Sequence, residues 1–142
     1  MSATSSTGIV RHSWFFGAVV LTLLLLSRLP QLLSPNLFLD GDEAIVGLMA
    51  RHLLAGQGLP TFFYGQAYGL ATFEVVSVAG MFLLLGPGAL GIKLGSLLIF
   101  GTGVLALAGA ARTWQGERAA WLIAMLCIAM PTWSSVSIRG WG

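Results

Sequence analysis

The sequence predicts an all-α, polytopic membrane protein with about four transmembrane helices and a short amphipathic helix in its first extracytoplasmic loop. Of its 142 residues, 56% are hydrophobic and only 8% are charged, whereas a soluble domain carries about 25% charged residues. The mean hydropathy is +0.87. This composition excludes a soluble globule and a disordered chain. A spanning helix needs about 20 residues, so the length allows four or five spans with loops.

The few charges exclude some functions. Seven basic and five acidic residues give a net charge of +2. The basic residues form no cluster, so the chain lacks the electrostatic footprint of a nucleic-acid-binding protein. Cys127 is the single cysteine, which rules out an intrachain disulfide and a cysteine-based metal motif.

The first apolar run predicts an uncleaved transmembrane span over residues 14–33. Residues 1–13 form a polar tail that we expect in the cytoplasm, and no small-x-small cleavage site follows the apolar run. We expect Arg28 to extend its charged end to the far interface. We therefore expect a multi-pass protein of the plasma (inner) membrane.

Three more charge-free runs predict three further spans within residues 75–142. They cover residues 75–92, 94–111 and 119–138, and the breaks between them contain turn-forming residues. Gly91 and Gly95 place small side chains at a four-residue spacing that permits close helix packing. With the N-terminus inside, Lys93 falls on the inner side and Arg112 and Arg118 on the outer side. The positive-inside rule does not choose between the two orientations.

The polar segment 34–74 contains a predicted interfacial helix over residues 41–55. Asp40 can cap this helix, and Glu43 follows at the spacing of a capping box. Gly56, Gly58 and Pro60 end it. A largely apolar stripe recurs at helical spacing, and it consists of Ile45, Leu48, Met49, His52 and Leu53. The helix is too short to span a bilayer, so we expect it to lie on the membrane surface.

The carboxylates of this segment have two interpretations. Asp42 and Glu43 could simply complement the helix dipole in the first turn. Alternatively, a carboxylate at the membrane–water boundary could take a proton from a hydroxyl nucleophile or hold a divalent cation, although two carboxylates alone do not specify an ion. Carboxylates near lipid are costly unless they are used or paired. We expect Glu74 to face the same cavity as Asp42.

An aromatic stretch follows the helix. It could form an interfacial aromatic belt or a platform on which a sugar stacks, with hydrogen bonds from Tyr64, Gln66 and Tyr68. His52 is interpreted as a packed or interfacial histidine rather than a ligand. Arg51 and Arg139 are candidate partners of a lipid phosphate, although Arg51 could also meet headgroups nonspecifically.

The order of these motifs resembles the N-terminal part of the GT-C membrane glycosyltransferases. More narrowly, it is similar to the family that includes protein O-mannosyltransferases and lipid A aminoarabinose transferases (glycosyltransferase family 39-like proteins). The resemblance covers roughly residues 14–142. The motifs that carry it are GDEA at 41–44, ARHLLAG at 50–56, FYGQAY at 63–68, Glu74, and the three downstream segments 83–96, 116–133 and 137–142.

The resemblance implies an inverting transferase. Such enzymes move a sugar from a polyprenyl-phosphate donor to a hydroxyl of a protein, lipid or glycan acceptor on the extracytoplasmic side. The first-loop Asp acts as general base, which falls on Asp42, with Glu43 as its catalytic neighbour. The family places this loop outside, which gives an inside N-terminus. Arg51, Tyr64, Gln66, Tyr68, Glu74 and Arg139 are the candidate substrate-binding residues.

Two departures from the family pattern matter. Aminoarabinose transferases carry a Glu-Lys-Pro-Pro element near the second span, whereas Glu74 is followed by two valines. The family also has many more spans, so we expect this chain to be the N-terminal piece of a longer protein and inactive alone. The alternative is a non-catalytic multi-span subunit or a small transporter. A transporter is disfavoured because no internal repeat relates the two halves.

Overall fold

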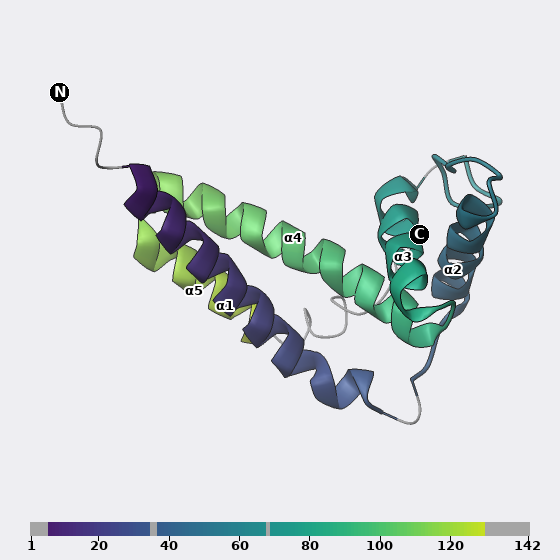
Figure 1. Cartoon of the computed structure of the whole chain (residues 1–142), viewed down its shortest axis with the longest axis horizontal. Coiled ribbons are helices and arrows are strands. Elements are labelled where there is room, and N and C mark those ends of the chain that lie inside the picture. Colours follow the sequence, from purple (N-terminus) through teal and green to yellow (C-terminus); the bar gives the residue numbers. More distant parts are fainter. Residues whose placement is uncertain (1–5, 35–36, 68, 130–142) are drawn as a thin grey trace.

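A computed structural model describes residues 6–34, 37–67 and 69–129, and all statements about the structure concern these ranges (Figure 1). They form five helices, and the predicted all-α class is confirmed. The helices are α1 (Ser6–Leu32), α2 (Gly41–Leu54), α3 (Thr72–Leu85), α4 (Ala89–Gln115) and α5 (Glu117–Ala129).

The two longest helices, α1 and α4, run antiparallel. Leu32 at the end of α1 packs with Leu97 near the start of α4, whereas Phe16 near the start of α1 packs with Ala108 near the end of α4. Helix α5 folds back along α4, and α2 and α3 form a hairpin beside the start of α4 (Figure 1). The molecule therefore has a three-helix part, with a two-helix hairpin at one end.

Two of the described helices are long and apolar enough to cross a membrane. They contain the stretches Trp14–Leu32 in α1 and Ala89–Gln115 in α4. A helix of 27 residues, such as α4, is about 40 Å long, which exceeds the hydrocarbon core of about 30 Å. Within the described ranges, length and composition thus identify two candidate spans.

Helix α3 is shorter than the predicted second span over residues 75–92. It has 14 residues and is therefore about 21 Å long. It ends at Gly86, whose φ of 79° favours glycine, and α4 begins only three residues later. The charge-free run at 75–92 is thus divided between the end of one helix and the start of another.

The short α3 corrects the predicted sides of three basic residues. Because α3 packs against α2 as a hairpin, the start of α4 lies at the same end of the molecule as α2 (Figure 1). Lys93 therefore lies beside the 34–74 segment rather than on the opposite side from it. Arg112 and Arg118 lie with the start of α1. The prediction that placed these three residues the other way round is wrong.

Glycines bring α3 and α4 close together. A Cβ atom on Gly91 would lie 2.8 Å from a ring carbon of Phe82, and one on Gly95 would lie 2.9 Å from the Cα atom of Val78. Ser77 also donates a hydrogen bond of 2.8 Å to the carbonyl of Gly95. The close packing that the four-residue spacing of Gly91 and Gly95 predicts therefore occurs between these two helices.

Arg28 has a different environment from the predicted one. Its side chain is buried, with 4% exposure, and its Nη2 atom donates a hydrogen bond of 3.1 Å to the carbonyl of Ile128 in α5. The guanidinium thus holds α1 against α5 instead of reaching an interface. The expected snorkelling is wrong because a backbone acceptor from another helix lies within reach.

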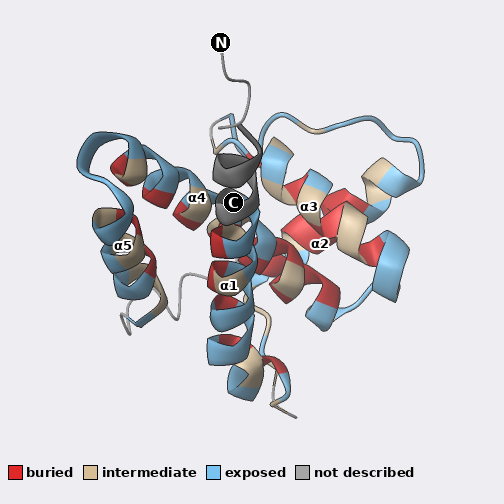
Figure 2. Cartoon of the chain, turned by 60° about the vertical axis from the view of Figure 1, so that its left-hand side comes forward, coloured by how far each residue is buried: buried red, intermediate tan, exposed pale blue. Residues whose placement is uncertain are grey.

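The apolar stripe of α2 faces α3. Met49 is fully buried between the two helices, and Ile45 and Leu53 pack against the same cluster. Figure 2 shows the buried positions of α2 and α3 turned toward each other. The stripe that was expected to contact the membrane is thus largely covered by protein. The outward face of α3 carries exposed apolar side chains instead, namely Phe73, Val76, Leu83 and Leu84.

Candidate functional site

The first turn of α2 is fixed by the predicted capping box. The backbone N–H of Glu43 donates to Oδ1 of Asp40 at 3.0 Å, and the backbone N–H of Asp40 donates to Oε2 of Glu43 at 3.0 Å. These reciprocal bonds satisfy two backbone donors that a helix start leaves free. The helix therefore begins at a defined residue, directly before Asp42.

Glu43 also forms a buried ion pair with Lys93 in the second turn of α4. The Nζ atom of Lys93 lies 2.5 Å from Oε1 and 2.7 Å from Oε2 of Glu43. The side chain of Lys93 is 5% exposed and that of Glu43 is 1% exposed. An uncompensated charge in such a place is strongly destabilising, so each residue needs the other. The pair ties the start of α2 to the start of α4.

Asp42, next in sequence to Glu43, is solvent-exposed. In the part of the chain that the structure describes, no hydrogen bond or ion pair holds its carboxylate. Its backbone is nevertheless fixed, because Asp42 lies between Asp40 and Glu43, which form the capping box. The ion pair with Lys93 also holds Glu43 in place. The carboxylate of Asp42 is therefore accessible at the fixed start of α2, at the end of the molecule where α1 ends and α4 begins.

The aromatic loop forms the far tip of the hairpin. The hydroxyl of Tyr64 lies 3.0 Å from Nδ1 of His52, so His52 has a side-chain partner in this loop. Phe63 is buried in the hairpin core, whereas Tyr64 and Gln66 are exposed. Tyr68 lies outside the described residues.

The structure does not bring Glu74 close to Asp42. The two residues stand at the starts of α2 and α3, which are antiparallel helices. Each start lies at a different end of a hairpin whose helices have 14 residues and are therefore about 21 Å long. The expectation that both carboxylates face one cavity is wrong, because α3 packs antiparallel against α2.

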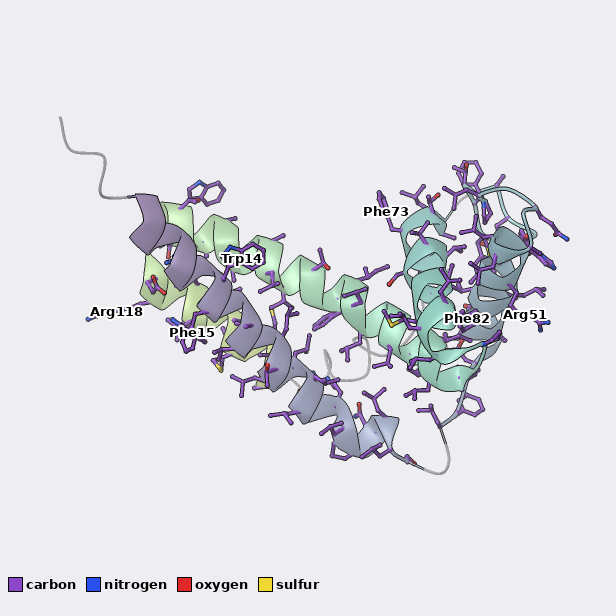
Figure 3. The ribbon with its side chains drawn as sticks, viewed as in Figure 1. Trp14, Phe15, Arg51, Phe73, Phe82 and Arg118 are labelled. Carbon is purple, nitrogen blue, oxygen red and sulfur yellow. The ribbon has the colours of Figure 1, made fainter. Side chains whose placement is uncertain are left out.

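Arg51 is also separated from Asp42. Nine residues correspond to two and a half helical turns, so the two side chains leave α2 on opposite faces and are about 14 Å apart along its axis. Arg51 is exposed and points away from α3 (Figure 3). It lines an open groove of about 340 Å³ with Leu48 and Pro87. Arg139 lies outside the described residues.

No group of three or more His, Cys, Asp or Glu side chains that could hold a metal ion occurs within the described ranges. Around Asp42 the nearest carboxylates in sequence are those of Asp40 and Glu43. Both are engaged in the capping box. The available donor set at the start of α2 is thus the single carboxylate of Asp42.

Comparison of the chain with protein-family models, with curated proteins and with solved structures finds no match in any of the three. The glycosyltransferase resemblance therefore rests on the motifs quoted above and stays a prediction.

Sequence reasoning missed Lys93 as a partner of the site. Lys93 and Glu43 are 50 positions apart, and Lys93 was interpreted as a charge between two spans. One signal was present in the sequence. Residues 75–111 contain no charged side chain except Lys93, and a lysine in such an apolar stretch requires a partner or an aqueous boundary.

Proposed function

We propose that the chain is the N-terminal part of a multi-pass glycosyltransferase of the plasma membrane. It would transfer a sugar from a polyprenyl-phosphate donor to an acceptor hydroxyl on the extracytoplasmic side, with inversion. The observation that carries this proposal is that two adjacent carboxylates have different environments. Glu43 is buried in an ion pair with Lys93, and Asp42 is exposed on the turn that this pair anchors.

The location of Asp42 supports a role at the membrane boundary. Lys93 lies in the second turn of α4, close to the start of the apolar stretch Ala89–Gln115, and Glu43 brings Asp42 to the same level. The apolar outer face of α3 fits a hairpin that rests in the outer part of the bilayer, with α2 toward water. With the N-terminus inside, this end of the molecule is extracytoplasmic, as the family resemblance implies.

Asp42 would act as the general base. Its carboxylate would accept the proton of the acceptor hydroxyl while the hydroxyl oxygen attacks the anomeric carbon and the bond to the polyprenyl phosphate breaks. Such a base contributes roughly 10²- to 10⁴-fold to the rate. Glu43 is the positioning residue, because a carboxylate enclosed with Lys93 is not accessible to a substrate.

The remaining candidate residues cannot all contact the same sugar as Asp42. Arg51 leaves α2 on the opposite face, so we assign it to a lipid headgroup beside the hairpin and leave the donor phosphate to Arg139. Tyr64, Gln66 and Glu74 lie toward the far end of the hairpin. They would contact a distant part of an extended acceptor.

A transfer assay tests the proposal. Membranes from cells that express the complete gene product are given labelled polyprenyl-phosphate sugars, and label in the acceptor fraction is compared with membranes that lack the gene. We expect transfer that falls about 10²- to 10⁴-fold in Asp42→Asn and is unchanged in the control Glu117→Gln, an exposed carboxylate at the other end of the molecule. Full transfer by Asp42→Asn would exclude it as the base.

A non-catalytic membrane subunit is the second candidate. It is favoured by the separation of the predicted site residues, since Asp42, Arg51 and Glu74 do not share one cavity. For this candidate, no labelled donor would be consumed with any sugar tested, and the protein would be recovered from mild detergent in a complex with another membrane protein.

A further inference from the structure

An apolar groove runs between α1 and α4, at the opposite end of these helices from the α2–α3 hairpin. Its volume is about 500 Å³, within the range of about 300–1,000 Å³ that is typical of ligand pockets. None of its lining residues comes from α5. The lining consists of Trp14, Phe16, Gly17, Ala18, Leu21, Leu105, Gly109 and Arg112.

The groove is open because small residues form part of both walls. A Cβ atom added to Gly17 or to Gly109 would meet no other atom within 4 Å. In contrast, a Cβ atom added to Gly101 would lie 3.0 Å from the side chain of Leu21 and 3.2 Å from that of Leu24, where α1 and α4 are in contact. The two helices are thus in contact at Gly101, and the groove lies on the side where Gly17 and Gly109 face open space.

The rim of the groove lies at the expected membrane boundary. Trp14 opens the apolar stretch of α1, and Arg112 stands near the end of the apolar stretch of α4. Trp14 is 77% exposed, and its side chain lies on the side of α1 that faces α4 (Figure 3). Tryptophan and arginine are residues that anchor a helix at the level of lipid headgroups.

The rim of the groove carries a guanidinium, that of Arg112. Arg112 donates from Nη2 to Oε2 of Glu117 at 2.8 Å, and its side chain keeps 26% of its surface exposed. A guanidinium has five N–H donors, so one carboxylate contact leaves others for a second anion. Among the described residues, the rim therefore presents the guanidinium of Arg112, which keeps N–H donors beyond its contact with Glu117.

We infer that this groove binds one anionic phospholipid of the surrounding leaflet. An acyl chain lies along the apolar walls, and the phosphate meets Arg112 at the rim. Basic pockets between transmembrane helices at the headgroup level are binding sites for acidic lipids. The inference is independent of the proposed transferase activity, since the groove lies at the opposite end of α4 from Lys93 and Asp42.

Native mass spectrometry of the purified protein tests this inference. The protein is released from detergent in the presence of equal amounts of phosphatidylglycerol and phosphatidylcholine with identical acyl chains. We expect one bound lipid, with a preference for phosphatidylglycerol of about fivefold, the factor that one cation near an anionic headgroup contributes. Equal binding of both lipids would overturn the inference.

Variants separate the contributions of the walls and the rim. Gly109→Leu fills the groove and should abolish binding of both lipids, whereas Gly103→Leu, on α4 with open space around it, should bind like the unmodified protein. Arg112→Gln should lose the preference but still bind a lipid, and Glu117→Gln should increase the preference. Unchanged binding in Gly109→Leu would place the lipid elsewhere.

Two further outcomes contradict the assigned occupant. If inorganic phosphate at millimolar concentration removes the preference, the rim binds free phosphate and not a lipid. If the protein is dimeric and Gly109→Leu makes it monomeric, a second copy of the chain fills the groove.

Discussion

The buried ion pair allows a quantitative test of how the hairpin is held. In Lys93→Met, the carboxylate of Glu43 keeps its buried position, with 1% exposure, and loses the cation that lies 2.5 and 2.7 Å from its two oxygens. Removing one partner of a buried pair costs about 3–5 kcal/mol. The capping box of Asp40 and Glu43 is not altered by this change, so the loss comes from the uncompensated charge.

Amide hydrogen exchange over α2 measures the effect. A cost of about 3–5 kcal/mol raises the population of the opened hairpin by a factor of about 10² to several thousand, and exchange through local opening accelerates by the same factor. We therefore expect residues 41–54 of Lys93→Met to exchange at least about 100-fold faster, while the amides at the centre of α4 change little.

Two controls define what would refute this reasoning. Arg112→Gln breaks a second ion pair of 2.8 Å whose side chains are 26% and 49% exposed, and such pairs contribute about 0–1 kcal/mol. The double variant Glu43→Gln/Lys93→Met removes both charges and should recover most of the protection of α2. If Lys93→Met exchanges no faster than Arg112→Gln, the pair does not anchor the hairpin.

The remaining predictions concern packing and membrane contact. In Gly95→Ala the new methyl group would lie 2.9 Å from the Cα atom of Val78, so we expect a loss of about 1–3 kcal/mol in unfolding free energy. Gly103→Ala, which meets nothing within 4 Å, should cost nothing, and equal stability of both variants would contradict the close approach. In liposomes, a spin label at Leu83 should be relaxed by oxygen and one at Ala44 by a water-soluble nickel complex. A label at Leu83 that responds mainly to nickel would show that α3 does not face lipid.

The local features of α2 could be predicted from the sequence. The spacing of Asp40 and Glu43 specifies a capping box, and the structure confirms it with reciprocal bonds of 3.0 Å. The predicted helix over 41–55 is observed over Gly41–Leu54. Both depend on interactions between residues that are close in sequence, which is why a spacing suffices to identify them.

The arrangement of the hairpin could not be predicted in the same way. A hydropathy window over 75–92 does not distinguish one span from the end of α3 followed by the start of α4, because both are free of charge. The turn at Gly86 was visible in the sequence, but its effect depends on Val78 and Phe82 packing against glycines of α4. Because residues 75–92 were assigned to a single span, Lys93 was not recognised as the partner of Glu43.

The central claim is that Asp42 acts as the base and that Glu43 positions it. A comparison of two variants tests this claim most directly. Transfer activity and hydrogen exchange of α2 are measured on Asp42→Asn and Glu43→Gln of the complete gene product. We predict that Asp42→Asn loses about 10²- to 10⁴-fold in transfer with unchanged exchange, whereas Glu43→Gln exchanges faster and retains activity in proportion to its folded fraction. Full activity in Asp42→Asn, together with an inactive but fully protected Glu43→Gln, would contradict the claim.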